Sequence, residues 1–343
     1  MDLDFSDEQE ALRVTLREFF EKESPPEVVR AAEPLGFDAA LWRKAVEMGL
    51  GAIAVPEDRG GGGAGWVELA IAAECLGRSL APVPLIEAAV ANLVLASVPG
   101  GADLDPLVSR AVGGEALATL ALHPVTGDVA RLVPAGAVAD LVVVLRGDEL
   151  LAVPVTGGPA EPVPNLGAMP IADRRVDEAG AVVLAKGPEA TAVHDRAVHH
   201  WRMLTGAALV GIASRALELG IAYVLERRAF GVLIGGFQTI QHRLADSTTA
   251  LEGARLLAYK AAWALDEGLP KAAELAAMSL LFASETAFKT ASDSLHFHGG
   301  YGYTLEYDVQ LYFRRAKAWP LLAGDPRAVY AQLPRRLFDP TEG

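Results

Sequence analysis

Apolar residues recur at helical spacing near the start of the chain. Leu12, Leu16, Phe19 and Phe20 fall on one face of a helix. Just before them, Ser6 and Gln9 fit a capping box, in which each side chain satisfies a backbone N–H group of the first turn. The pattern therefore predicts an amphipathic helix that begins directly after Ser6.

Further helices are predicted along the first 112 residues. One runs from Asp38 to Gly49, where the glycine would serve as a C-cap. Another covers about 66–76, and a third follows Pro84. The glycine-rich segment 56–65 resembles a phosphate loop only superficially, because no Gly-Lys-Ser/Thr follows it, and we interpret it as a helix connector.

The middle of the chain has a different pattern. Short apolar runs are separated by Pro, Gly and Asp, which is typical of strands joined by turns. The runs are Val133, Val138, Leu141 to Leu145, Leu150 to Val153 and Val182 to Leu184. Residues 113–188 are therefore predicted to form a small β domain.

From about residue 189 the helical pattern returns. Long alanine-rich segments lie near 191–228, 239–267 and 270–297, and their small side chains would let helices approach closely in an antiparallel bundle. The fold class predicted from this order is α+β and mostly α, with a β insert between two helical parts. The predicted domains are residues 1–112 (helical), 113–188 (β) and 189–343 (four-helix bundle).

Composition limits the function classes. The 343-residue chain has a net charge of −14, which disfavours nucleic acid as a partner because a phosphate-backbone binder needs a basic surface. CoA is also polyanionic but needs only a local cationic pocket. Cys75 is the single cysteine, so neither an internal disulfide nor a multi-cysteine metal site is expected.

The same composition bears on location. No uninterrupted run of about 18 apolar residues is present, so a membrane span is not expected. The chain starts Met-Asp-Leu-Asp-Phe, which is acidic where a secretory signal would be basic. We expect a cytoplasmic protein.

Two segments of the C-terminal third carry the most specific motifs. Residues 225–231 read Leu-Glu-Arg-Arg-Ala-Phe-Gly and are followed by Gln238, and residues 298–303 read His-Gly-Gly-Tyr-Gly-Tyr. This pair closely resembles the FAD-binding signature of the acyl-CoA dehydrogenase family. Weaker similarity to the family extends over the N-terminal helical part, including residues 5–9 and 74–78.

The resemblance implies a shared cofactor site. In that family FAD lies between subunits, and its ADP half is held by the neighbouring chain's C-terminal bundle. Carried over, Arg227 would bind the pyrophosphate, because a guanidinium suits phosphate oxygens. Phe230 would pack against the cofactor and Gln238 would hydrogen-bond near the ADP. Gly299 and Gly300 would let backbone N–H groups approach the ligand.

His296 and His298 form a His-x-His pair. A metal site is disfavoured because carboxylate and cysteine partners are absent nearby in the sequence. The resemblance instead places His296 where a glutamine usually contacts the flavin nucleotide of the partner chain. Histidine can also donate or accept a hydrogen bond there.

The chain departs from the family at the catalytic base. The family removes the α proton of an acyl-CoA thioester with a glutamate, while the β hydride goes to the flavin. Ala323 occupies the glutamate's position. Some members carry the base just before an arginine on an earlier helix; that arginine resembles Arg202, and Trp201 precedes it. No catalytic residue is therefore assigned. Arg202 is expected to support a substrate pocket, which Trp201 would fill.

The β domain also lacks the family's contacts to the isoalloxazine ring, and it is shortened there. With the missing base, this makes the chain resemble the base-lacking subunit of bacterial heteromeric acyl-CoA dehydrogenases. In those α2β2 heterotetramers a catalytic paralogue supplies the glutamate, and several act on steroid side-chain CoA thioesters. The implied partners are thus an acyl-CoA thioester and a complete dehydrogenase chain.

Two alternatives stay open. A self-sufficient dehydrogenase would need a relocated base, for which His199, His200 and Asp325 are candidates. The simpler interpretation of these residues is a polar helix start for the histidines and a helix N-cap for the aspartate. The other alternative is a non-catalytic binding or scaffold protein, which the retained cofactor residues disfavour.

Overall fold

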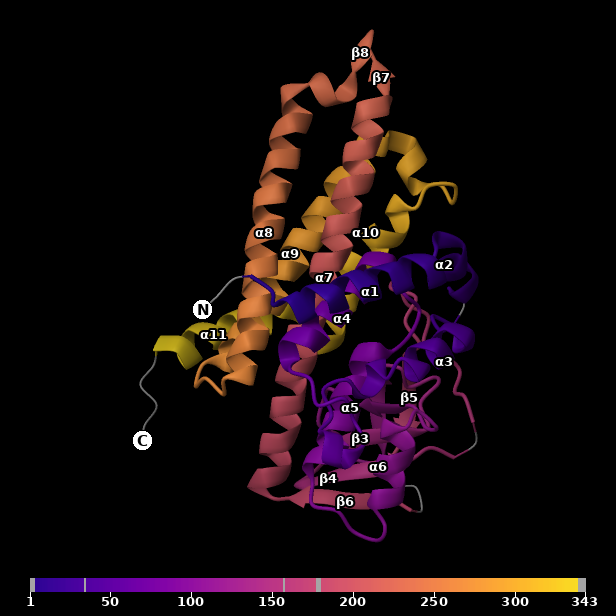
Figure 1. Cartoon of the computed structure of the whole chain (residues 1–343), viewed down its shortest axis with the longest axis vertical. Coiled ribbons are helices and arrows are strands. Elements are labelled where there is room, and N and C mark those ends of the chain that lie inside the picture. Colours follow the sequence, from indigo (N-terminus) through magenta and orange to yellow (C-terminus); the bar gives the residue numbers. More distant parts are fainter. Residues whose placement is uncertain (1–3, 34, 157, 177–179, 339–343) are drawn as a thin grey trace. The chain divides into compact units, whose positions relative to one another are not determined.

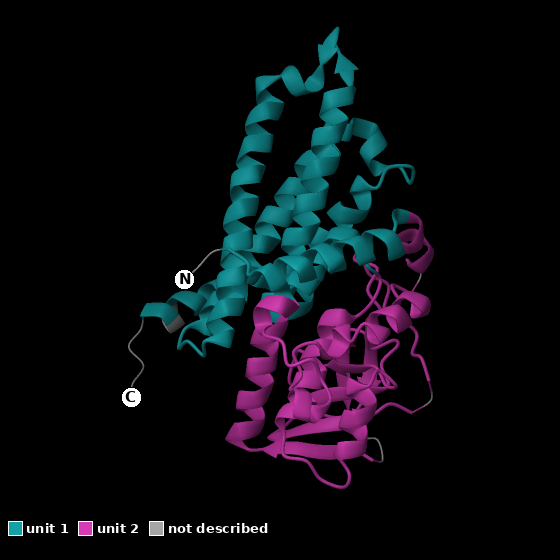
Figure 2. Ribbon diagram, viewed as in Figure 1, with its two compact units in different colours: residues 1–26, 70–81, 202–343 teal, residues 27–69, 82–201 magenta. Residues whose placement is uncertain are grey.

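A computed structural model describes residues 4–33, 35–156, 158–176 and 180–338 (Figure 1). The chain divides into two compact units (Figure 2). Unit 1 comprises Met1–Pro26, Ala70–Ala81 and Arg202–Gly343, and unit 2 comprises Glu27–Leu69 and Pro82–Trp201. Because the units interleave along the sequence, the domain boundaries at residues 112 and 188 stay predictions.

The predicted N-terminal helices are present. They are α1 (Asp7–Glu23), α3 (Ala39–Glu47), α4 (Trp66–Ser79) and α5 (Leu85–Ser97), and the structure adds α2 (Pro26–Ala32) and α6 (Asp105–Val112), which were not predicted. The capping box of α1 is confirmed: Gln9 N donates to Ser6 Oγ at 3.2 Å, and Ser6 N donates to Gln9 Oε1 at 3.1 Å. Leu16 and Phe20 are buried on the predicted face.

Helix ends differ slightly from the predictions. Asp38 caps α3 by accepting from Leu41 N at 2.8 Å. Met48, and not Gly49, is the C-cap residue; Gly49 follows it with a φ of 71°, where glycine avoids a Cβ clash. α4 continues to Ser79, beyond the expected end at 76. The glycines at 60–63 form the predicted connector between η2 (Glu57–Arg59) and α4.

The middle of the chain forms the predicted small β structure. Its strands are β1 (Ala118–Leu120), β2 (Val129–Val133), β3 (Leu141–Arg146), β4 (Glu149–Pro154), β5 (Ala172–Arg175) and β6 (Val182–Lys186). The four-stranded sheet has the order β1-β3-β4-β6, in which β1 pairs with β3 in parallel and the other pairs are antiparallel. β2 and β5 form a separate antiparallel pair.

One strand prediction is wrong and two strands were not predicted. Val138 lies in a turn between β2 and β3, where its N–H donates to Ala135 O. β1 is only three residues long, and β5 reads Ala-Asp-Arg-Arg, so neither has the apolar run that marks a strand. On β3, Val142 and Val144 alternate onto one buried face, as a period of two requires.

The antiparallel bundle is confirmed, and its residues from Arg202 onward belong to unit 1. Its long helices are α7 (Pro188–Glu226), α8 (Gln238–Asp266) and α9 (Ala272–His298), followed by α10 (Val309–Ala318) and α11 (Pro326–Phe338) (Figure 1). α7 and α9 meet through small residues: a Cβ atom on Gly206 would lie 2.5 Å from Ser279 Oγ, and one on Gly220 would lie 2.5 Å from Ser294 Oγ. Larger residues at either glycine would push the helices apart.

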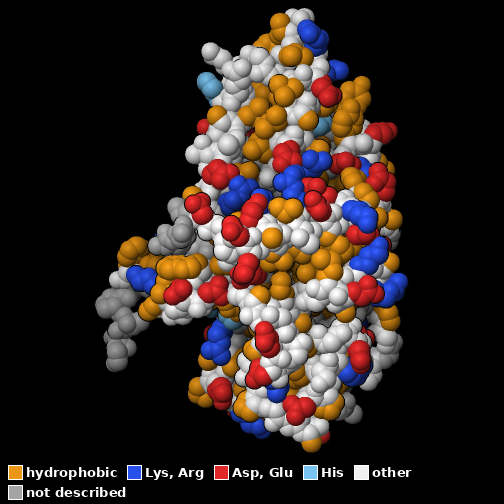
Figure 3. All heavy atoms as spheres, viewed as in Figure 1, with side chains coloured by type: hydrophobic (Ala, Val, Ile, Leu, Met, Phe, Trp, Pro, Cys, Tyr) orange, Lys and Arg blue, Asp and Glu red, His pale blue; other side chains and the backbone are white. Residues whose placement is uncertain are grey.

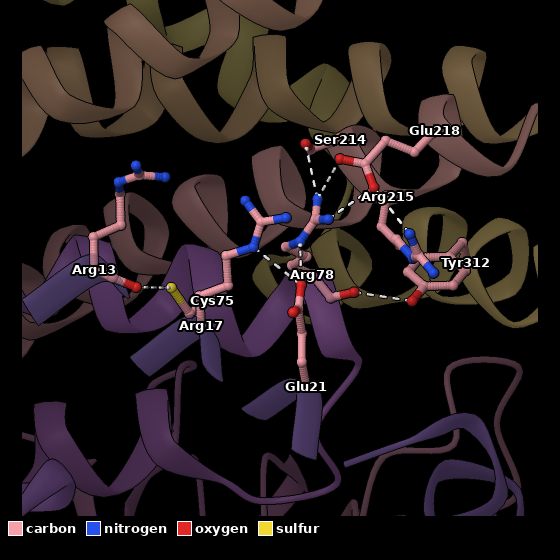
Figure 4. A network of polar contacts seen from close by, with 9 residues as sticks. All are labelled: Arg13, Arg17, Glu21, Cys75, Arg78, Ser214, Arg215, Glu218 and Tyr312. Carbon is pink, nitrogen blue, oxygen red and sulfur yellow. Dashed lines mark hydrogen bonds and ion pairs between the residues drawn. The ribbon is translucent and has the colours of Figure 1, made fainter. Parts of the chain in front are cut away.

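Arg78 of α4 organises a polar network inside unit 1 (Figure 4). Its guanidinium donates to both carboxylate oxygens of Glu218 on α7 at 2.7 Å, and Nε donates to Glu21 on α1 at 3.2 Å. The backbone carbonyl of Arg78 accepts from Tyr312 Oη of α10 at 2.9 Å. We call Glu21, Arg78, Ser214, Glu218 and Tyr312 the Arg78 network. It joins four helices that lie far apart in the sequence.

α7 is the one described helix that is long and apolar enough to cross a membrane by length and composition alone. Its most apolar window has a mean hydropathy of 1.6, and 56% of that window is buried inside the protein. Such burial is expected of the central helix of a bundle, which is apolar on several sides.

Candidate cofactor-binding site

The segment that joins α7 to α8 is a short hairpin at one end of the bundle (Figure 1). β7 (Arg228–Ala229) pairs with β8 (Val232–Leu233), and Phe230 and Gly231 form the loop with φ values of 54° and 85°. Positive φ at both loop residues is the pattern of a type I′ turn. The left-handed conformation is costly for phenylalanine, and strain of this kind clusters at functional sites.

The ring of Phe230 is held out of the protein. The residue is 96% exposed, and its ring contacts that of Phe237 only edge-on, with centroids 6.4 Å apart. Other large apolar residues are also exposed in these segments of unit 1: Leu225, Val232, Tyr301, Tyr303 and Leu305. Figure 3 shows hydrophobic side chains gathered over this end of the bundle. Contiguous exposed apolar surface marks a binding or assembly site.

A small core beneath the hairpin brings the two sequence motifs together. Val224 at the end of α7, Ile234 after β8 and Phe297 near the end of α9 form one buried cluster. Residues 225–238 and 296–303 therefore lie at the same end of unit 1. We call these two segments the hairpin end.

The end of α9 places its two histidines in different surroundings. His298 is buried, stacks on Tyr223 with ring centroids 4.0 Å apart, and its Nδ1 lies 2.7 Å from Ser294 O. Burial lowers the pKa of His298. His296 is exposed instead. Within the described ranges, no three His, Cys, Asp or Glu side chains are grouped so that they could hold a metal ion.

The two glycines after His298 leave open space. Gly299 has a φ of 60°, which favours glycine, and a Cβ atom on Gly299 or Gly300 would meet no atom of this chain within 4 Å. Both residues are exposed, so backbone groups at this turn are accessible to a ligand.

Two polar side chains of the hairpin end have donors that no described residue accepts from. Arg227 and Gln238 are exposed, and in the part of the chain that the structure describes neither side chain makes a hydrogen bond or an ion pair. A free guanidinium, an exposed ring and accessible backbone at one end of a bundle suit a phosphate-bearing aromatic ligand. These residues therefore fit an FAD whose adenine half lies here.

Arg202 is not part of this group. It is partly buried within α7, 25 residues before Arg227, which corresponds to about 38 Å along a straight helix. The sequence-predicted substrate residue thus lies inside α7, far from the cofactor residues, which begin with Arg227 just after the end of that helix. Ala323 ends the short helix η5 (Trp319–Ala323).

The position before Arg202 holds a feature that the sequence did not reveal. Trp201 is 2% exposed, and its indole Nε1 donates to Glu87 Oε1 of α5 at 3.2 Å. Both residues belong to unit 2. Glu87 is partly buried, and burial raises the pKa of its carboxyl. The two residues are 114 positions apart, so no local pattern announces the pair.

His199 and His200, two candidates for a relocated base, lie inside a helix and not at its start. The prediction that His199 and His200 form a polar helix start is wrong, because α7 begins at Pro188 and both lie inside it. The His200 ring packs on that of Trp66 at a tilt of 38°, with centroids 3.9 Å apart, and burial lowers the pKa of His200 to about 3, so it is a poor proton acceptor near neutral pH.

Asp325 has the predicted role of a cap. Its Oδ1 accepts from Arg327 N at 2.9 Å, and its carboxylate pairs with the Arg327 guanidinium at 2.6 Å. The hydrogen bond from Arg327 lowers the pKa of Asp325. Both contacts are made to Arg327 in the first turn of α11, so the carboxylate is used to cap that helix.

Comparison with known proteins agrees with this geometry. The models described as acyl-CoA dehydrogenase N-terminal and C-terminal domains match residues 6–99 and 191–337. Acyl-CoA dehydrogenase IpdE2 of Mycolicibacterium smegmatis is 32% identical over 336 residues, which cover 97% of this chain and 100% of that protein.

Two solved structures are also similar over nearly the whole chain. A variant of the Tcur3481–Tcur3483 steroid ACAD has a TM-score of 0.84 at 27% identity and covers 96% of this chain and 98% of that one. The ChsE4–ChsE5 complex from Mycobacterium tuberculosis has a TM-score of 0.87 at 25% identity and covers 99% and 100%. The chain belongs to the acyl-CoA dehydrogenase family of FAD-dependent oxidoreductases.

Proposed function

We propose that this chain is the base-lacking subunit of a heteromeric acyl-CoA dehydrogenase. The observation that carries the proposal is that neither family base position has a carboxylate, since they hold Ala323 and Trp201. The predicted cofactor residues are nevertheless retained, and Arg227, Phe230 and Gln238 are exposed. A chain that had lost the whole function would have little reason to hold Phe230 in a strained conformation and 96% exposed.

The hairpin end would hold the ADP half of FAD. Arg227 binds the pyrophosphate, Phe230 packs on the cofactor, and Gln238 and His296 donate or accept hydrogen bonds near the nucleotide. Backbone N–H groups at Gly299 and Gly300 complete the contacts. FAD held by these residues would supply an acceptor for the β hydride of the thioester, and a carboxylate of the partner chain would take the α proton.

The similar proteins support a partner and a substrate class. The ChsE4–ChsE5 complex is an assembly of two different chains, and Tcur3481–Tcur3483 is a steroid ACAD. By this similarity the partner is a complete acyl-CoA dehydrogenase paralogue in an α2β2 heterotetramer, acting in the cytoplasm on steroid side-chain CoA esters. Residues 189–343 would serve both cofactor binding and assembly.

Purification of the chain alone and with its partner tests the proposal. Flavin absorbance per chain and mass in solution are measured for both samples. We expect the chain alone to be colourless and inactive, and co-expression with a dehydrogenase paralogue to give a yellow, active heterotetramer.

Two results would contradict this. A yellow homotetramer that dehydrogenates an acyl-CoA by itself would point to a relocated base. A chain that binds no FAD with any dehydrogenase paralogue would point to a scaffold without turnover.

A further inference from the structure

A cavity of about 450 Å³ lies in unit 1 beside the Arg78 network. Every residue that lines it belongs to that unit, and three of them are arginines: Arg17 of α1, Arg78 of α4 and Arg215 of α7 (Figure 4). Neither the residues assigned to FAD nor the two base positions line it. A volume in this range is typical of small-molecule sites, which makes the cavity a candidate for a ligand other than FAD.

The three guanidinium groups share two carboxylates. Arg17 Nε and Arg78 Nε both donate to Glu21 Oε1, at 3.0 and 3.2 Å. Glu218 accepts from Arg78 at 2.7 Å and from Arg215 Nη1 at 2.9 Å. Three cations thus face two carboxylates in this group, although the whole chain has a net charge of −14. Like charges held this close to one another favour an added anion.

The two outer arginines are placed to bind such an anion. The Arg17 side chain is 44% exposed, and among the described residues neither of its terminal nitrogens has an acceptor. The Arg215 side chain is 43% exposed. Arg78 between them is 10% exposed and bonds to the carboxylates that both outer arginines use. The outer guanidinium groups are therefore already ordered, which lowers the entropic cost of binding a ligand.

Two further groups decide which anion fits. The Ser79 hydroxyl lines the cavity and makes no hydrogen bond among the described residues, so it adds a donor. Asp308, just before α10, lines the cavity as a carboxylate that repels anions. Chloride has no directed oxygens and gains little here. A phosphate accepts the two parallel bonds that a guanidinium fork donates and has a further oxygen for the hydroxyl.

We propose that this cavity binds a phosphate dianion, held by Arg17 and Arg215 with the Ser79 hydroxyl as a further donor. Inorganic phosphate and the end of a phosphate monoester present the same group, so the chemistry is shared by both sources. Bound phosphate ties α1 to α7, two helices that Arg78 already joins through α4. The inference is independent of the proposed function, because no contact to FAD or to an acyl-CoA enters it.

Titration calorimetry of the full chain with inorganic phosphate tests the site. It is done at constant ionic strength and at about pH 8, where phosphate is mostly a dianion. We expect one saturable site per chain. A parallel titration with adenosine monophosphate distinguishes the sources: tighter binding than that of inorganic phosphate indicates a monoester, and equal or weaker binding indicates free phosphate.

Variants of opposite sign make the test specific. Arg17→Gln removes charged donors and should raise the Kd for phosphate about 10-fold. Asp308→Asn removes a repelling charge and should lower the Kd about 3-fold. Arg13→Gln is the matched control, because Arg13 lies on the same helix and lines a neighbouring cavity of about 370 Å³ but not this one. Its Kd should be unchanged.

Three results would overturn the inference. They are the lack of saturable phosphate binding in the natural chain, an unchanged Kd in a folded Arg17→Gln variant, and a loss of binding in Arg13→Gln, which would place the anion in the neighbouring cavity. Circular dichroism checks that each variant folds. If Arg17→Gln fails to fold, Asp308→Asn decides alone, since it leaves every arginine in place, and an unchanged Kd there contradicts the assignment.

Discussion

Unit 1 contains two arginines in opposite situations, Arg78 in its network and Arg227 at the hairpin end. The Arg78 side chain is 10% exposed, and its guanidinium makes bonds to Glu21, Ser214 and Glu218. Arg227 is exposed and has no side-chain partner among the described residues. A saturated arginine holds helices together, whereas an unsaturated one is available to a ligand.

The aromatic residues of the two regions differ in the same way. Tyr312 is buried and its hydroxyl is satisfied by Arg78 O, while Phe230 stands in a left-handed turn with its ring in solvent. Exposed apolar rings and unpaired charges both favour a state in which something covers them. The contrast predicts that mutations in the first region affect folding and mutations in the second affect assembly and cofactor.

The largest effect is expected from Arg78→Ala. Removing a buried, forked guanidinium leaves a cavity and takes away the bonds that Glu21 and Glu218 accept from it, which should lower the free energy of unfolding by about 3 kcal/mol. Denaturant unfolding measures it. Arg13→Ala is the matched control, because that side chain pairs with Glu10 on its own helix, outside the network, so its loss should cost about 0.5 kcal/mol. Equal losses in both variants would mean that the network does not stabilise the bundle.

Arg227→Ala should act on the cofactor and not on folding. Loss of charge-assisted bonds to a pyrophosphate costs about 2 kcal/mol, or about a 30-fold higher Kd for FAD in the assembled pair. Arg228→Ala is the control, since among the described residues the guanidinium of Arg228 bonds only to Gly231 O, at 3.4 Å. FAD affinity measured by flavin fluorescence should be nearly unchanged in the control. A drop in thermal stability of Arg227→Ala without a change in FAD binding would contradict the assignment.

Phe230→Gly should give a smaller effect of mixed sign. Glycine accepts the φ of 54° without strain, so the isolated chain should gain up to about 1 kcal/mol of stability. The pair should lose the ring's packing, and FAD release should be about 5-fold faster. Phe230→Tyr keeps the ring and should retain FAD. A stable variant with unchanged FAD release would show that the exposed ring serves another contact.

The sequence predicts this molecule well where the signal is local or matches a family. The capping box at Ser6, the long alanine-rich helices and the two segments of the hairpin end all follow from neighbouring residues. β5 could not be predicted, because its Ala-Asp-Arg-Arg sequence has no apolar alternation.

Contacts between distant residues were also beyond the sequence. Glu87 and Trp201 are separated by 114 residues, and Arg78 and Glu218 by 140, so their pairing depends on how the helices pack. The polar role of each residue type was visible, but its partner was not. At the hairpin end the ligand was inferred from the family motif and not from contacts within the chain.

The smallest expected effect is a pH dependence that belongs to the Arg78 network. Partial burial raises the pKa of Glu218, but hydrogen bonds from Arg78 and Arg215 outweigh it, and the net pKa lies below the usual value of 4.5. A carboxyl whose pKa is lower in the folded state adds stability above its unfolded pKa, and this stability is lost as pH falls through the folded value. Unfolding free energies at about pH 7 and about pH 4 should therefore differ more in the natural chain than in Arg78→Ala. Parallel acid sensitivity in both would mean that Glu218 does not sense Arg78, and the two arginines would then differ in exposure alone.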